Sequence, residues 1–144
     1  MGRIIVHLHG RAKDAAFRMA ISDYANRLAG DGVQLSEHRN RTDPGPYLQS
    51  IVDKAGSSNV IVLEERGENI DSMGYAEKMK QWRLSSADIH LVVGPPGGFG
   101  EHSKDMASLS LGLITLPHEL AAVVLLEQLY RASTIIRGLP YHRA

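Results

Sequence analysis

Short apolar runs alternate along this chain with segments of helical periodicity, and this alternation limits the possible folds more than any other feature. Residues that favour strands occupy 3–9, 33–37, 59–63, 89–93 and 113–116. The runs at 59–63 and 89–93 are continuous enough to be buried strands. Alternation of this kind is typical of an α/β fold with a mainly parallel sheet flanked by helices.

The helical segments are defined by apolar periodicity and by the residues that interrupt it. Apolar residues are spaced by four, three and four positions at Phe17, Ile21, Tyr24 and Leu28. They predict an amphipathic helix that ends at the Gly-Asp-Gly of 30–32. Further helices are predicted at 47–55, 71–84, 101–109 and 119–136, and polar loops at 39–46 and 64–70.

Length and composition indicate one compact domain covering residues 1–144. With 43% hydrophobic residues, 144 residues are sufficient for one core. Sixteen basic residues balance sixteen acidic ones, so any binding of nucleic acid must be local. Cysteine is absent and the seven histidines show no metal-ligand spacing, so we expect no metal. No signal peptide or membrane span is recognisable, which predicts a cytoplasmic protein without a membrane partner.

The last predicted helix is apolar around almost its whole circumference, from Leu120 to Leu126 and again at Leu129. A helix of this kind must be buried on all sides. A domain of 144 residues has difficulty doing so by itself, so we expect a second copy to cover the outer side in a two-fold homodimer. The alternative is a central helix buried inside one domain.

Two Gly/Pro loops indicate a binding site built from the main chain. The strand at 89–93 opens into Gly94-Pro95-Pro96-Gly97-Gly98-Phe99-Gly100, and a second run ends in Leu116-Pro117-His118. Glycine allows close approach to a ligand and proline stiffens the chain. The first loop matches neither common nucleotide-binding glycine motif, and an ordinary turn or a phosphate-binding turn before the next helix is the alternative.

Four segments together carry a family resemblance: Gly94-Pro95-Pro96-Gly97-Gly98, the run at 113–118, the segment at 127–132, and Pro140-Tyr141-His142-Arg143. With them the chain resembles the RlmH family, the SPOUT-class methyltransferases of large-subunit ribosomal RNA. The resemblance implies a homodimer with a C-terminal trefoil knot that binds S-adenosylmethionine. It also implies methylation of N3 of a pseudouridine in large-subunit ribosomal RNA, on assembled ribosomes.

The resemblance also implies which residues hold the cofactor. Carried over by position, they are Leu63, Gly94, Gly98, Gly112, Leu113, Ile114, Thr115, Leu116 and Pro117. This assignment is chemically reasonable, because main-chain groups of 112–117 can match the polar edge of adenine while apolar side chains form the walls. Two departures from the family pattern are Pro95 in place of a glycine and Gly97 in place of a glutamate.

The C-terminal residues are the candidates for catalysis. Methylation at N3 requires the loss of a weakly acidic proton, and neutral His142 is the best candidate for a general base. Arg143 could stabilise charge on the pyrimidine oxygens or hold a phosphate, and Tyr141 could stack on a base or donate a hydrogen bond. The alternative is a frayed, solvated tail.

Several alternatives remain open at this stage. His118 could simply cap the last helix or bond a backbone carbonyl, and Arg131 is expected to pair with Glu127 one turn earlier. Basic residues could form an RNA-binding surface across a dimer: Arg39, Arg41, Arg131, Arg137 and Arg143. The other functional hypotheses are a SPOUT methyltransferase acting on transfer RNA or another ribosomal base, and a non-catalytic RNA- or nucleotide-binding module.

Overall fold

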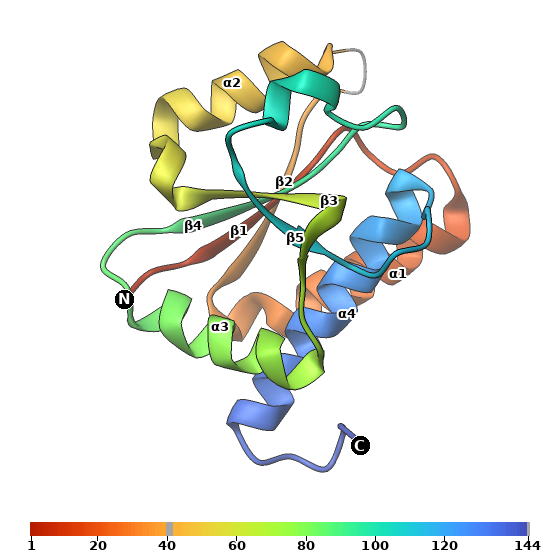
Figure 1. The fold of residues 1–144 in the computed structure, drawn as a ribbon. Coiled ribbons are helices and arrows are strands. Elements are labelled where there is room, and N and C mark those ends of the chain that lie inside the picture. The colour runs from red at the N-terminus through yellow and green to blue at the C-terminus, as the bar shows by residue number, and fades with distance from the viewer. Residues whose placement is uncertain (40–41, 144) are drawn as a thin grey trace.

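The central feature of the structure, a computed structural model, is a five-stranded parallel sheet (Figure 1). The structure describes residues 1–39 and 42–143, so Arg41 lies outside the described residues. Every strand pairing is parallel, which confirms the α/β class. The strand order is β2-β1-β4-β3-β5, with β1 (Ile4–Leu8), β2 (Val33–Glu37), β3 (Val60–Asn69), β4 (Ile89–Val93) and β5 (Ala107–Ser110).

Helices cover both faces of the sheet, as parallel strands require. One face packs against α1 (Ala15–Leu28), α3 (Ser72–Leu84) and α4 (His118–Ile136). The other packs against α2 (Pro44–Ala55) and the short 3-10 turn η3 (Gly100–Ser103). Figure 1 shows α2 on one side of the strands and α3 and α4 on the opposite side. Two apolar layers therefore enclose the central strands.

Strand periodicity explains how one strand serves both layers. In β4, Leu91 belongs to the core under α1, α3 and α4, whereas Val92 belongs to the core under α2. Successive side chains of a strand point to opposite faces, so a strand covered on both faces must be apolar almost throughout. This is why the buried run at 89–93 could be recognised from sequence.

Local polar groups set the helix starts. The Asp14 side chain accepts hydrogen bonds from the backbone N–H groups of Ala16 and Phe17, and Asp71 accepts one from Gly74. These are the donors that an α-helix leaves unpaired in its first turn. Helix α2 begins at Pro44, earlier than the predicted start at 47, because proline is well suited to the first turn, where no N–H is required.

Two predictions for the second half of the chain were wrong. Residues 101–109, predicted as a helix, form the end of η3, a turn and strand β5. Residues 113–116, predicted as the fifth strand, are a loop in which Leu113 and Ile114 are 81% and 70% exposed. Ala107–Ser110 forms the fifth strand beside β3, and residues 113–116 belong to the loop that follows it.

The polar loop predicted at 64–70 was also wrong. Strand β3 continues to Asn69, with a break in register between Leu63 and Glu68 against Leu109 of β5. At the bulge, Gly67 lies so close to the β5 backbone that a Cβ atom would come within 2.6 Å of the Leu109 carbonyl carbon. Pairing with β5 thus overrides the polar composition of these residues, because tertiary context decides strand formation more than intrinsic preference does.

Helix α4 is covered only in part by its own chain. Its buried residues pack against α1 and α3 and include Ala122, Leu125, Leu126 and Leu129. Leu120, Val123 and Val124 are only half-buried. In the part of the chain that the structure describes, no helix is both long and apolar enough to cross a membrane.

Candidate active site

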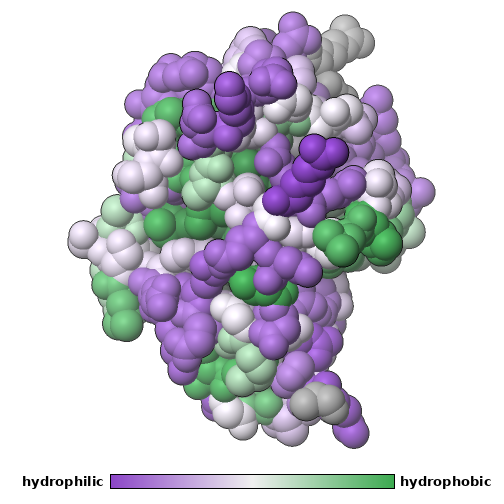
Figure 2. Space-filling view, in the orientation of Figure 1, coloured by the Kyte–Doolittle hydropathy of each residue, from purple (hydrophilic) through white to green (hydrophobic). Residues whose placement is uncertain are grey.

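The carboxyl ends of β3, β4 and β5 open into a cleft with a volume of about 790 Å³. Ligands of open parallel sheets bind at this edge, where neighbouring loops leave in different directions. Its walls come mainly from three stretches: 63–66 at the bulge of β3, 93–101 after β4, and the loop after β5 from Leu111 to His118. Residues between the last two also line it: Ser103, Lys104, Met106 and Ser108. Figure 2 shows that apolar patches interrupt a mainly hydrophilic surface in the view of Figure 1.

The cleft brings together most of the residues assigned to the cofactor from sequence. Lining residues from that set are Leu63, Gly94, Gly98, Gly112, Ile114, Thr115 and Leu116. Leu113 and Pro117 lie in the same loop but do not line the cleft. Three segments that are separate in the sequence thus share one cavity, because their strands are neighbours in the sheet.

The glycine loop after β4 is bare on its outer side and anchored on its inner side. Gly98 and Gly100 have φ values of +74° and +58°, and a Cβ on either would meet no atom within 4 Å. Beneath the loop, buried Phe99 stacks on Tyr47, whose hydroxyl donates to the Val93 carbonyl at 2.7 Å. The following helical turn, η3, is only four residues long, so no α-helix begins here.

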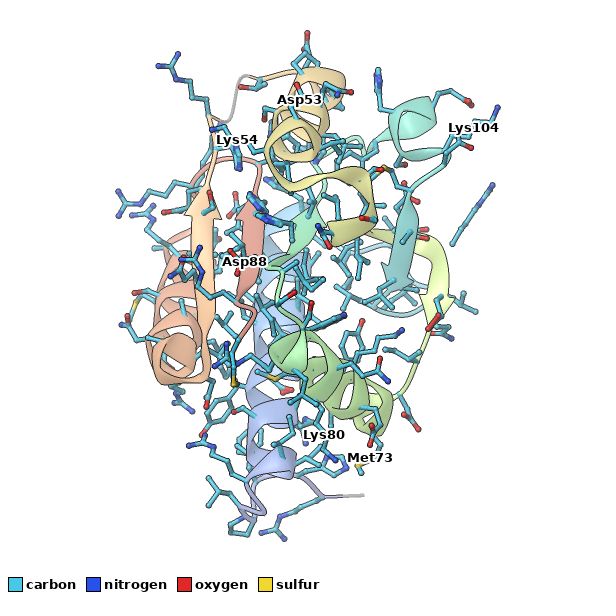
Figure 3. All side chains as sticks on the ribbon, turned by 90° about the vertical axis from the view of Figure 1, so that its left-hand side faces the viewer. Asp53, Lys54, Met73, Lys80, Asp88 and Lys104 are labelled. Carbon is cyan, nitrogen blue, oxygen red and sulfur yellow. The ribbon has the colours of Figure 1, made fainter. Side chains whose placement is uncertain are left out.

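The C-terminal tail lies at the opposite end of the molecule. His118 lines the cleft at the first residue of α4, and the tail follows its last residue. The 19 residues of α4 span about 28 Å at the usual helical rise. Figure 1 shows the segment after α4 continuing beyond the far end of that helix. Figure 3 shows Lys104, which lines the cleft, at one end of the molecule and Met73 and Lys80 of α3, which packs along α4, at the other. The structure therefore does not bring the tail to its own cleft.

Specific side-chain contacts hold Tyr141 and His142 against α4, which contradicts the frayed, solvated alternative for these two residues. Tyr141 packs edge-on against Tyr130 with ring centres 4.9 Å apart, and the Arg131 guanidinium lies 4.9 Å from the Tyr141 ring centre. Burial, with a hydrogen bond to Tyr24, raises the pKa of the Tyr141 hydroxyl. Arg131 also makes the predicted pair with Glu127, at 3.0 Å. We call Glu127, Tyr130, Arg131, Tyr141 and His142 the tail cluster.

Comparison with known proteins identifies the family. Residues 3–142 match the family described as predicted SPOUT methyltransferase. The chain belongs to the SPOUT methyltransferases. The ribosomal RNA large subunit methyltransferase H of Anaeromyxobacter sp. (strain Fw109-5) is 36% identical over an alignment of 152 positions. The alignment covers 98% of this chain and 99% of that protein. A protein of the same name from Cereibacter sphaeroides (strain KD131) is 36% identical over 146 residues, 93% of this chain and 94% of that protein.

A solved structure supports the SPOUT fold independently of sequence similarity. The crystal structure of TrmJ from Z. mobilis ZM4 aligns with a TM-score of 0.52 over 93% of this chain and 70% of that one. The sequence identity is only 11%, so this likeness concerns the fold alone. The family match and the two relatives confirm the resemblance recognised from the sequence motifs.

This SPOUT cleft also contains polar residues that the sequence motifs did not single out. Glu64 follows Leu63 directly, is half-buried in the cleft wall, and accepts a hydrogen bond from the hydroxyl of buried Ser103. None of the ion pairs among the described residues includes Glu64. The sequence could have indicated Glu64 as a candidate, because it is an acidic residue directly after the predicted buried strand at 59–63. Glu64 thus adds a carboxyl group to the cleft wall, which Arg66 and Lys104 also line.

The loop after β1 is tied to the start of α4 beside the cleft. The Glu119 carboxylate accepts hydrogen bonds from the backbone N–H groups of Lys13 and Asp14 at 3.0 and 3.1 Å, and the bond from Lys13 lowers its pKa most. Burial lowers the pKa of His118, although Glu119 opposes this shift. His118 makes no capping hydrogen bond, since no side chain caps α4. The expected capping role was therefore wrong.

Three histidines form a hydrogen-bonded chain across the sheet under the edge of α2. His7 of β1 lies 2.8 Å from both His38, just after β2, and His90 of β4. Burial, followed by the charges of His38 and His90, lowers the pKa of His7 to about 3. His7 and His90 point to the same face of two neighbouring strands, so their side chains meet. Their spacing along the sequence gives no indication of this contact. Among residues 1–39 and 42–143, no group of histidine, cysteine and acidic side chains could hold a metal ion.

The basic residues expected to form one surface are divided between the two ends of the protomer. Arg39 follows the carboxyl end of β2, at the same edge of the sheet as the cleft. Arg131, Arg137 and Arg143 lie at the far end of α4, where Arg137 is 3.7 Å from Asp31. Any continuous basic surface formed by these residues requires a second protomer.

Proposed function

We propose that this protein transfers the methyl group of S-adenosylmethionine to N3 of a pseudouridine in large-subunit ribosomal RNA, on assembled ribosomes in the cytoplasm. The supporting observation is a cleft built from two bare main-chain loops in a chain of the SPOUT family. The names of the 36%-identical relatives support ribosomal RNA as the substrate. Pseudouridine N3 as the target rests on the resemblance of the motifs.

The cleft fits S-adenosylmethionine in size and chemistry. Its volume of about 790 Å³ lies within the range of small-molecule sites. At Gly97, Gly98, Gly100 and Gly112, no atom lies within 4 Å of the position of a Cβ, so ligand atoms can approach the main chain directly. Leu63 and Leu116 supply apolar walls, and the three acidic residues that line the cleft outnumber its two basic residues, Arg66 and Lys104. When bound, the cofactor supplies an electrophilic methyl group on a good leaving group.

The distance between cleft and tail supports a site shared by two protomers. The length of α4 separates each tail from the cleft of the same protomer by about 28 Å. A cleft can therefore receive a tail only from the partner protomer. An antiparallel two-fold pairing along α4 would place each tail beside the partner's cleft and cover Leu120, Val123 and Val124. We therefore include the homodimer, together with the C-terminal trefoil knot that the resemblance implies, in the proposal.

The chemical task of the protein is mainly orientation and charge stabilisation. The ring of the target base must lie with N3 in line with the methyl group, and charge develops on its two carbonyl oxygens as the proton leaves. Arg143 offers a permanent positive charge for these oxygens, and Tyr141 offers an aromatic face and a hydroxyl. His142 acts at the edge of the base that contains N3 and the two carbonyl oxygens.

Methyl transfer from labelled S-adenosylmethionine tests the substrate. Whole ribosomes, separated subunits and bulk transfer RNA are incubated with the protein, and the modified nucleotide is identified by nuclease digestion and mass spectrometry. We expect label at N3 of a pseudouridine in the large-subunit RNA of assembled ribosomes. Label on transfer RNA would keep the cofactor and overturn the target, and no label on any RNA would favour a non-catalytic binding module.

Mixing two inactive variants tests the shared site. Gly98→Val blocks the cleft, and the double variant His142→Ala, Arg143→Ala removes the polar tail. A mixed dimer contains one site with an intact cleft and an intact partner tail, so we expect activity to reappear on subunit exchange. If each chain used its own tail, the mixed dimer would have no intact site and activity would stay absent.

A further inference from the structure

The C-terminal histidine is held by a guanidinium group. Nη1 of Arg131 lies 3.1 Å from Nδ1 of His142. The other two nitrogens of Arg131 donate to the two carboxylate oxygens of Glu127 at 3.0 and 3.2 Å. The guanidinium also lies over the Tyr141 ring, 4.9 Å from its centre. Glu127 and Tyr141 therefore fix the guanidinium plane, and the remaining Nη1 is directed at His142.

This contact determines which nitrogen of a neutral His142 carries the proton. A guanidinium group has only N–H donors and keeps its charge throughout the working pH range. Nδ1 of His142 must therefore be the acceptor. A neutral imidazole has a single N–H, so the proton is on Nε2. The lone pair on Nδ1, which a general base would use, already accepts a hydrogen bond from Arg131. The free nitrogen, Nε2, carries an N–H group that can only donate.

We propose that Arg131 is a positioning residue that keeps His142 in its Nε2–H tautomer, and that His142 acts by donating this hydrogen bond to a carbonyl oxygen of the target base. The inference rests on the proposed function and deepens it. It replaces the general-base role that the sequence suggested for His142 with an electrostatic one.

The reaction balances without a base from the protein. N3 of a pseudouridine lies between two carbonyl groups, and its proton leaves to hydroxide, which becomes water. The ring anion shares its charge with both oxygens, where Nε2–H of His142 and the guanidinium of Arg143 stabilise it. N3 then bonds to the methyl carbon while the carbon–sulfur bond breaks, and its electron pair remains on sulfur as a neutral thioether.

Nitrogen-15 NMR of the protein labelled at its histidines tests the tautomer without turnover. At a pH at which His142 is neutral, we expect essentially all wild-type molecules to have an unprotonated Nδ1 and a protonated Nε2. In Arg131→Met, both tautomers should be populated. A proton on Nδ1 in the wild type would overturn the assignment, as would a spectrum that Arg131→Met leaves unchanged.

Two amide variants separate a donor from a base. Gln places an amide N–H near the position of Nε2 and Asn places one near Nδ1, and neither accepts a proton at neutral pH. For a donor role, His142→Gln should keep activity on ribosomes within about tenfold of wild type, whereas His142→Ala and His142→Asn should lose about 100-fold or more in kcat. Equal losses in all three variants would show that His142 is a base.

Arg131 is tested by its conservative variant and by cofactor binding. Arg131→Lys keeps one charged donor and should recover part of the activity that Arg131→Met loses, while affinity for S-adenosylmethionine stays near wild type in both. Reduced cofactor affinity in step with activity would show that Arg131 acts on the cleft and overturn its positioning role.

The two proposals can fail separately. A wild type that neither binds S-adenosylmethionine nor labels any RNA would refute the proposed function, and the NMR result would still decide the tautomer. A wild type that labels ribosomal RNA, combined with a His142→Gln variant as inactive as His142→Ala, would keep the function and overturn the donor role.

Discussion

The two ends of α4 present two different kinds of site. At its first residue the cleft is built from main chain, with glycines whose outer sides are bare. At its far end the tail cluster is built from side chains, with an arginine holding an aromatic ring, a carboxylate and an imidazole. The cleft offers shape for a ligand, and the tail offers charge and hydrogen bonds. Binding and chemistry should therefore respond to different substitutions.

The largest expected effect separates chemistry from binding. The double variant His142→Ala, Arg143→Ala removes the polar groups proposed to act on the target base. We expect kcat on ribosomes to fall by roughly 10²–10⁴-fold, while calorimetry gives an unchanged affinity for S-adenosylmethionine. Loss of cofactor binding in this variant would show that the tail and the cleft are not separable.

The second largest effect is expected on cofactor binding, from a substitution in the cleft. Gly98 has a φ of +74° and an open outer side, so Gly98→Val both strains the loop by about 1–2 kcal/mol and places a side chain in the cleft. We expect calorimetric affinity for S-adenosylmethionine to fall at least about tenfold, because steric exclusion adds to the strain. Gly30→Ala is the matched control, since Gly30 is exposed, outside the cleft and has no close neighbour. Equal loss in both variants would contradict a local effect.

A third effect concerns the chain of hydrogen-bonded histidines formed by His7, His38 and His90. The pKa of His7 is lowered to about 3, whereas the unfolded chain binds the proton near its usual value of about 6.5. Between these values the unfolded state holds more protons, so stability falls as the pH decreases from 6.5 toward 3. The slope should be somewhat less than about 1.4 kcal/mol per pH unit, because solvent screens part of the effect.

Urea denaturation at pH 7.5 and 5 measures this slope. His7→Gln keeps hydrogen-bonding groups and cannot titrate, so it should flatten the pH dependence. Other charged groups around the chain are Lys54 and His9 near His38, and Asp88 and Arg3 near His90. His102→Gln is the control, because His102 is exposed and does not belong to the hydrogen-bonded histidines. It should leave the dependence of stability on pH unchanged. An equal flattening in both variants would refute the assignment to His7.

The smallest expected effect tests the support under the glycine loop. Tyr47 is fully buried, and its hydroxyl is bonded to the Val93 carbonyl immediately before Gly94. Tyr47→Phe should cost about 1–3 kcal/mol of stability, lower the melting temperature and weaken cofactor binding slightly. Tyr141→Phe removes a hydroxyl at the tail instead and should leave cofactor binding unchanged. If both variants bind the cofactor as wild type does, Tyr47 supports the core but not the loop.

Sequence reasoning succeeded where local pattern and burial agree. The four strands at 3–9, 33–37, 59–63 and 89–93 and the long helix at 119–136 correspond to β1 to β4 and α4. It failed around the cleft, where 101–109 and 113–116 were assigned to the wrong elements. Ile114 and Leu116 of the second segment line the cleft instead of pairing in the sheet, and apolar composition alone does not distinguish a cavity wall from a strand.

By itself, the sequence determined the parallel α/β class, the glycine loop after β4 and the SPOUT family, because strand burial, main-chain freedom and motif residues are all encoded locally. Only the tertiary structure decided that β5 is 107–110, that Glu64 and Ser103 meet in the cleft wall, and that the tail lies at the opposite end of α4. These facts depend on which strands become neighbours and on the length of one helix, and no local pattern encodes contacts between segments so far apart in the chain.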